Sequence, residues 1–196
     1  MKKISLEKLL KKILEFRDKR NWKKYHSPKN MIIAFYCELA ELAEHFQYET
    51  DKSIKEKSKI YDEKISDELI DVLWWTLLIA HEYGIHIDNP TIRNKINKFY
   101  PRKSLLIMFN SIGKISSEIV GSKDKIQKKY LLKNKKAFSK EIQSIFNQVV
   151  LFSIFFNLDV EKEFLRKFDK NNKKYPINSK RISLLKLISD KLHKTI

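Results

Sequence analysis

Hydrophobic residues recur at helical spacing over three stretches in the first half of the chain. The first stretch covers residues 5–24, in which leucine, isoleucine and phenylalanine share one side. The second covers residues 28–47, and the third runs from about residue 60 to residue 83, just before Gly84. Each stretch predicts an amphipathic helix. The charged segment between the last two, residues 49–59, is predicted to be a loop.

The same pattern continues in the second half. Residues from 89 onward indicate further helices, with breaks at 121–136 and at 175–176. Ser27 is the expected N-cap of the second helix, because Pro28 suits the first helical position. The chain holds only 3 Gly and 4 Pro in 196 residues, which argues against turn-rich β architecture and for an all-α fold.

The chain also resembles itself at an offset of 73 residues. At this offset Pro28 aligns with Pro101, and residues 84–87 align with residues 157–160. The apolar positions of the two intervening helices align as well. A single offset that serves two helices and the loop between them indicates an internal duplication.

We therefore predict two tandem copies that share one core. Residues 1–88 form the first copy, residues 89–177 the second, and residues 178–196 a C-terminal tail helix. The expected architecture is all-α, a bundle of four helices built from two degenerate repeats. Such a chain is a pseudo-dimer within one polypeptide.

Two pairs of acidic residues stand out in the first copy, Glu38 with Glu41 and Glu68 with Asp71. Spacing of three places each pair on one helix face, beside apolar residues. Two such pairs on antiparallel helices would gather four carboxylates, which cannot be buried together without cations. Carboxylate oxygens suit Mg²⁺ or Mn²⁺. The alternative interpretation of either pair alone is a solvated helix face.

The second copy lacks this chemistry. Its equivalent residues are Ser111, Lys114, Glu141 and Ser144, so three of the four carboxylates are missing while the apolar frame persists. The second copy is therefore interpreted as a scaffold for a single site in the first.

Four motifs in order resemble the all-α nucleoside triphosphate pyrophosphohydrolases, the MazG-like superfamily, and most closely its dCTP pyrophosphatase branch. The matching residues are Phe16, Arg20, Trp22, His26, Pro28, Lys29 and Asn30; then Glu38, Glu41, Leu42, Ala43, Glu44, Phe46 and Gln47; then Glu68, Leu69, Asp71, Val72 and Leu73; and finally Lys167, Asn171, Tyr175, Pro176 and Arg181. The tandem arrangement also resembles the dimeric all-α dUTPases of that superfamily.

The resemblance implies a Mg²⁺-dependent enzyme that cleaves a nucleoside triphosphate to a monophosphate and pyrophosphate, with a pyrimidine deoxynucleotide such as dCTP or dUTP as the expected substrate. Mn²⁺ is an alternative metal. The implied metal ligands and catalytic residues are Glu38, Glu41, Glu68 and Asp71. The implied substrate-binding residues are Trp22, His26, Lys29, Asn30, Tyr48, Trp75, Lys167, Asn171, Tyr175 and Arg181. Core packing is the alternative role for the aromatic rings, and stabilisation of the helix start is the alternative role for His26. Trp74, which points to another side of its helix, is expected to belong to the core.

Two departures from the family pattern shape this hypothesis. Tyr48 stands where the family has tryptophan, and the lysine–asparagine–tyrosine tail, from Lys167 to Tyr175, occurs once, at the end of the second copy. We therefore expect one composite site, with carboxylates from the first copy and phosphate-binding groups from the second. Without the resemblance, the tail would be interpreted as a lysine-rich helix end.

The net charge of the chain leaves alternative functions open but does not point to a particular motif. The net charge is +17, yet only six of the 41 basic residues are arginine, so we interpret most of it as lysine-biased composition. A nucleic-acid-binding helical protein and a non-catalytic scaffold stay open as alternatives, as does a homodimer. Cys37 is the single cysteine, and no apolar run is long enough to span a membrane, so we expect a cytoplasmic protein.

Overall fold

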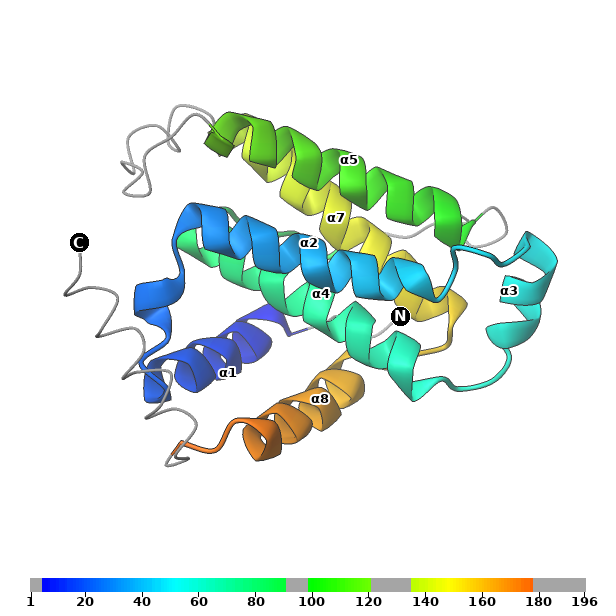
Figure 1. The fold of residues 1–196 in the computed structure, drawn as a ribbon, viewed down its shortest axis with the longest axis horizontal. Helices are drawn as coiled ribbons and strands as arrows, with labels where there is room; N and C mark the ends of the chain where they lie inside the picture. The colour runs from blue at the N-terminus through cyan, green and yellow to red at the C-terminus, as the bar shows by residue number, and fades with distance from the viewer. Residues whose placement is uncertain (1–4, 91–98, 121–134, 178–196) are drawn as a thin grey trace.

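The computed structural model describes residues 5–90, 99–120 and 135–177, and in these ranges every regular element is helical. The all-α prediction is therefore confirmed (Figure 1). The elements are α1 (Leu6–Lys19), the 3₁₀ turn η1 (Lys23–Tyr25), α2 (Pro28–Glu44), α3 (Asp51–Lys57), α4 (Glu63–Glu82), α5 (Pro101–Val120), α7 (Lys135–Phe155) and α8 (Val160–Lys174).

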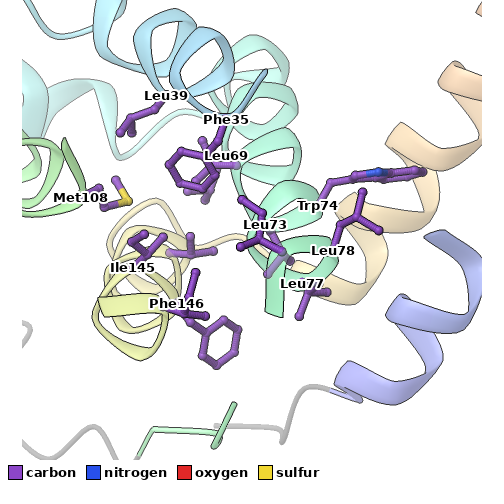
Figure 2. Packing of buried hydrophobic residues seen from close by; sticks show 14 of the residues in the cluster. Phe35, Leu39, Leu69, Leu73, Trp74, Leu77, Leu78, Met108, Ile145 and Phe146 are labelled. Atoms are coloured by element: carbon purple, nitrogen blue, oxygen red, sulfur yellow. The ribbon is translucent and has the colours of Figure 1, made fainter. Parts of the chain in front are cut away.

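Four of these helices form the bundle. α2 packs on α4 and α5, and α7 packs on α5 and α4, so two helical hairpins share one core. α1 and α8 pack on α4 and on each other, which places them on one side of the bundle (Figure 1). Figure 2 shows the core residues contributed by the four bundle helices, among them Phe35 and Leu39, Leu69 and Leu73, Met108, and Ile145 and Phe146.

The two neighbouring tryptophans of α4 differ in burial, as expected of adjacent positions on a helix. Trp74 is buried on the side of α4 that faces α8 (Figure 2), where its ring stacks on Phe164 at 5.7 Å between centroids. Trp75 is only half-buried. The sequence-based expectation that Trp74 belongs to the core is confirmed.

Local signals explain where the second helix begins. The Ser27 hydroxyl accepts a hydrogen bond from the Asn30 backbone N–H at 3.3 Å, and Pro28 occupies the first turn. The predicted N-cap is therefore confirmed. Helix α2 ends at Glu44, three residues before the predicted end, and helix α4 begins only at Glu63, because the Asp62 side chain caps its first turn.

The prediction of a loop over residues 49–59 is wrong, because α3 lies there. Thr50 and Ser53 form a reciprocal capping box, in which each side chain accepts a hydrogen bond from the other residue's backbone N–H. Ile54 then anchors the short helix, since its side chain is fully buried. A capping box with one buried anchor stabilises seven residues that lack a full hydrophobic stripe.

The two hairpins begin and end at equivalent positions. α2 begins at Pro28 and α5 at Pro101, while α4 ends at Glu82 and α7 at Phe155, all consistent with the 73-residue offset. This agreement supports the predicted duplication.

The chain leaves both hairpins through the same backbone geometry. Gly84 and Asn157 both have positive φ, 61° and 52°. One residue further, the Ile85 N–H donates to a carbonyl of α4 at 2.8 Å and the Leu158 N–H donates to the equivalent carbonyl of α7 at 2.7 Å. A left-handed residue followed by this long-reach hydrogen bond is a Schellman ending.

The tandem boundaries themselves stay a prediction.

Some sequence-based expectations fall outside the described residues. These include the tail helix over residues 178–196, Arg181 within it, and most of the break expected at 121–136. Within the described ranges no helix alone is long and apolar enough to cross a membrane. Helices α7 and α8 meet such a criterion only as a pair, and they are bent by 99° at their junction.

The two described glycines predict opposite responses to alanine. At Gly84 the left-handed backbone penalises a Cβ, so Gly84→Ala should lower the free energy of unfolding by about 1–2 kcal/mol. At Gly113, inside α5, a new Cβ would lie 3.7 Å from the Tyr36 hydroxyl, an ordinary contact. Gly113→Ala should therefore raise the free energy of unfolding by up to about 1 kcal/mol. Urea denaturation measures both, and equal effects would contradict the assigned backbone conformations.

Candidate functional site

Three carboxylates from two helices converge at one side of the bundle. Glu38 and Glu41 lie one turn apart on α2, and Glu68 lies on α4; one carboxylate oxygen of each is within 4.8 Å of the other two. The apolar partners in the same turns, including Leu42 and Leu69, are buried in the core. Packing of α2 on α4 therefore brings the acidic sides of both helices together.

The shared negative charge perturbs these groups. Burial first, and then the neighbouring Asp71, Glu41 and Glu68 carboxylates, raise the pKa of Glu38 to about 7. Burial also raises the pKa of Glu68, with further contributions from Asp71 and Glu41. Lys167 offsets only part of this charge, and a hard divalent cation bound among the carboxylates would supply the remainder.

Asp71, the fourth predicted ligand, is held differently. Its carboxylate accepts from the Lys167 ammonium of α8 at 2.5 Å, so it is ion-paired and stands beside the three-carboxylate group rather than within it. Burial nevertheless raises the pKa of Asp71, while Lys167 opposes that shift. The contact brings a residue of the predicted phosphate-binding tail to the acidic centre.

A second ionic cluster, not predicted from the sequence, fastens α8 to α4. Asp67 is buried and pairs with Arg166 at 2.6 Å and also with Lys170. Arg166 donates to Glu163 at 2.8 Å, and Glu163 accepts from the Ser66 hydroxyl at 2.9 Å. The sequence signal that could have identified Asp67 is its spacing. Asp67 lies four residues before Asp71, on the same side of α4, and therefore faces α8 as well.

Several predicted substrate-binding residues pack the ends of α1 and α8 together. The Trp22 ring meets Tyr175 edge-to-face at 5.3 Å. Arg20 is buried, and its guanidinium donates to the Tyr175 carbonyl at 2.8 Å and to the Asn172 side chain at 2.9 Å. The backbone carbonyl of Asn171 accepts a hydrogen bond from the Tyr175 backbone N–H at 2.9 Å, which closes the end of α8. These contacts hold the end of α8 in place.

Trp75 lies on α4, one turn beyond Asp71. The His26 ring lies beside it, with 5.6 Å between the two ring centroids. Burial and the nearby Arg17 cation lower the pKa of His26, which favours the neutral ring. Its buried Nδ1 has no hydrogen-bond partner among the described residues.

The remaining predicted residues are spread around this region. Lys29 is half-buried at the start of α2, and the exposed Asn30 side chain donates to the Tyr25 carbonyl at 2.9 Å. Tyr48 is 91% exposed, so its ring stacks on none of the residues that the structure describes. Arg181 lies outside the described residues. The structure thus gathers the carboxylates with Lys167, and it keeps Tyr48 apart from them in open solvent.

Comparison with known proteins agrees with the family resemblance that the sequence motifs indicated. The chain is 33% identical over 88 residues to dCTP pyrophosphatase 1 of Rattus norvegicus and of Mus musculus, which covers 44% of this chain and 51% of theirs. It is 33% identical over 78 residues to the Homo sapiens protein of the same name, 39% of this chain and 46% of that one. The resemblance to dCTP pyrophosphatases is confirmed over that part of the chain.

The extent of this similarity is limited. The chain spans about half the length of the curated relatives it matches. No family model matches the chain, and no solved structure gives a significant match.

The raised pKa of Glu38 predicts how the metal-free protein responds to pH. Between its ordinary pKa of 4.5 and about 7, the folded chain keeps a proton that the unfolded chain releases. The free energy of unfolding should therefore fall as pH rises through this interval. Glu38→Gln removes that cost, so it should raise the free energy of unfolding at pH 8 by about 1–2 kcal/mol after solvent screening.

Denaturation in the presence of a chelator measures this effect. Near pH 4 the Glu38→Gln variant and the parent protein should unfold alike, since Glu38 is then protonated in both states. Glu44→Gln, at an exposed position of the same helix, is the matched control and should show no such pH dependence. If Glu38→Gln lost stability relative to the parent protein between pH 4 and pH 8, the result would contradict the crowded acidic cluster.

Proposed function

We propose that this protein is a Mg²⁺-dependent nucleotide pyrophosphohydrolase that converts a pyrimidine deoxynucleoside triphosphate, such as dCTP or dUTP, into the monophosphate and pyrophosphate. The observation that carries the proposal is the convergence of Glu38, Glu41 and Glu68 beside the basic helix α8. Acidic groups for a cation and basic groups for phosphates are then adjacent. The printed names of the relatives supply the substrate class.

The donor set fits the proposed metal. All three converging groups are carboxylates, which are hard oxygen ligands, and burial together with the neighbouring carboxylates raises the pKa of Glu38. Bound Mg²⁺ supplies charge neutralisation for the triphosphate and lowers the pKa of an attacking water. Glu38, Glu41 and Glu68 would hold the ion, and Asp71, whose charge acts on Glu38, is the proposed fourth ligand. One of these carboxylates would accept the proton of the water as general base.

Lys167 links the two halves of the proposed site. Its ammonium has three hydrogens, so it donates to Asp71 and still has donors for a phosphate oxygen. Asp67 and Asp71 hold the Lys167 side chain at the edge of the acidic centre, with contacts at 4.0 and 2.5 Å. A pre-positioned cation stabilises the charge that develops on the leaving pyrophosphate.

The proposed base-binding side is at Trp75 and His26. Trp75 is half-buried one turn beyond Asp71, so its ring has a free portion for stacking on a nucleobase. The pKa of His26 is lowered by burial, so its ring is neutral near pH 7 and offers one donor and one acceptor. Tyr48, although exposed in this structure, stays a proposed contact for the nucleotide.

The first test of the function is a substrate panel. Pyrophosphate release should be measured for the common ribo- and deoxynucleoside triphosphates with Mg²⁺, and we expect a pyrimidine deoxynucleotide to give the highest kcat/KM. Glu38→Gln should lower kcat/KM by about 100-fold or more, because one ligand of the cation is lost. Chelation of the metal should abolish turnover.

Glu44→Gln, on the same helix but exposed, is the matched control and should retain full activity. Absence of release from every nucleotide, or equal release by Glu38→Gln and the parent protein, would refute the proposal. The outcome also separates dCTP from dUTP, whose discrimination depends on hydrogen bonds at the base edge.

The second test concerns Lys167. Lys167→Met should lower kcat/KM by about 100-fold, whereas binding of Mg²⁺ alone, measured by calorimetry, should persist because Glu38, Glu41 and Glu68 are intact. Lys173→Met, at an exposed position near the end of the same helix, should leave both quantities unchanged.

Lys167→Arg keeps the ion pair with Asp71 and serves as a check on folding. A folded Lys167→Met variant with unaltered kcat/KM would exclude the proposed phosphate contact.

A further inference from the structure

The two hairpins correspond in more than their helix ends. After α4, the backbone of Asp88 exchanges two hydrogen bonds with the Gln143 side chain of α7, at 2.8 and 2.9 Å. After α7, helix α8 returns to α4, where Lys167 reaches Asp71. Each hairpin therefore sends its following segment onto the second helix of the other hairpin. Reciprocal crossing of this kind is expected of two copies related by approximate twofold symmetry.

This correspondence identifies the counterpart of the acidic centre. At the 73-residue offset, Lys114 of α5 stands for Glu41 and Glu141 of α7 stands for Glu68. The two counterpart residues form an ion pair across the second hairpin, with 3.1 Å between Nζ and Oε1. Glu141 is half-buried and Lys114 exposed, which matches the burial of Glu68 and Glu41.

The other two counterparts carry no charge. Ser111, which corresponds to Glu38, is buried, and Ser144, which corresponds to Asp71, is half-buried. The second hairpin thus retains one carboxylate and one ammonium where the first has four carboxylates. A single ammonium neutralises a single carboxylate, so this cluster needs no added cation.

We infer that α5 and α7 carry a closed counterpart of the acidic centre, in which the Lys114 ammonium takes the place of the divalent cation, and that restoring the carboxylates would open a second cation site there. The inference rests on the proposed function only in treating the α2–α4 cluster as a cation site. It explains why the described residues form one acidic centre although they contain two equivalent hairpins.

The test transfers the carboxylates to the second hairpin. The background is Glu38→Gln with Glu41→Gln, which removes two ligands of the first centre. Into it are placed Ser111→Glu, Lys114→Glu and Ser144→Asp, which together with Glu141 recreate the four-carboxylate set. We expect this variant to bind Mn²⁺ about tenfold more tightly or better than its background, since three carboxylates are gained, and to show a Tm that rises with added Mn²⁺.

Two further variants make the result decisive. Lys114→Glu alone, in the same background, perturbs the fold less and should still gain a Mn²⁺-dependent rise in Tm. Lys114→Met also removes the ammonium but adds no ligand, so its Tm should not respond to Mn²⁺ beyond the background. Electron paramagnetic resonance of free Mn²⁺ measures binding directly.

The outcomes separate this inference from the proposed function. Loss of Mn²⁺ binding from the parent protein to the background tests the first centre. If Lys114→Glu folds and responds to Mn²⁺ no more than Lys114→Met does, the closed-site inference is wrong, whatever the first centre does. If the multiple variant folds only with Mn²⁺, the inference is supported. If that variant fails to fold even with Mn²⁺, Lys114→Glu against Lys114→Met decides.

Discussion

Packing of α2 against α4 forces mutually repelling carboxylates together, and the rest of the molecule accommodates that contact. Leu39, Leu42 and Leu69 are buried between the helices, and their burial offsets the electrostatic cost of Glu38, Glu41 and Glu68. The raised pKa of Glu38 is the measurable sign of this conflict. Because Lys167 compensates this charge only in part, the arrangement is suited to receive a cation.

Helix α8 places positive charge at the edge of the acidic centre. Lys167, Arg166 and Lys170 approach α4 and pair with Asp71 and Asp67, while Trp74, Phe164 and Phe168 stack beneath them. The aromatic stack fixes the helix position and the ion pairs fix the basic side chains. The contrast with the second hairpin is instructive, because there the Lys114–Glu141 pair closes within the hairpin itself. The charge of the second hairpin is thus compensated from within that hairpin, whereas the acidic centre of the first is compensated only in part, by a neighbouring helix.

Much of this arrangement could be predicted from local pattern. Helical periodicity located α2 and α4, Ser27 and Pro28 marked a helix start, and spacing of three paired Glu38 with Glu41. The missed features have a common physical origin. Helix α3 depends on a capping box and one buried isoleucine rather than on a stripe, and Asp67 acquired its partners only when α8 was folded onto α4.

The sequence by itself determined the helical class, the offset between the hairpins and the residue types able to bind a cation, because periodicity and spacing act within single helices. Only the tertiary structure decided that Glu68 joins Glu38 and Glu41, that Asp71 pairs with Lys167, and that Tyr48 is left in solvent. These outcomes depend on which helix faces lie against each other, between residues 30 apart for Glu38 and Glu68 and 96 apart for Asp71 and Lys167. Burial and Coulomb energy, which set the pKa of Glu38 and the partner of Asp71, exist only after those faces have met.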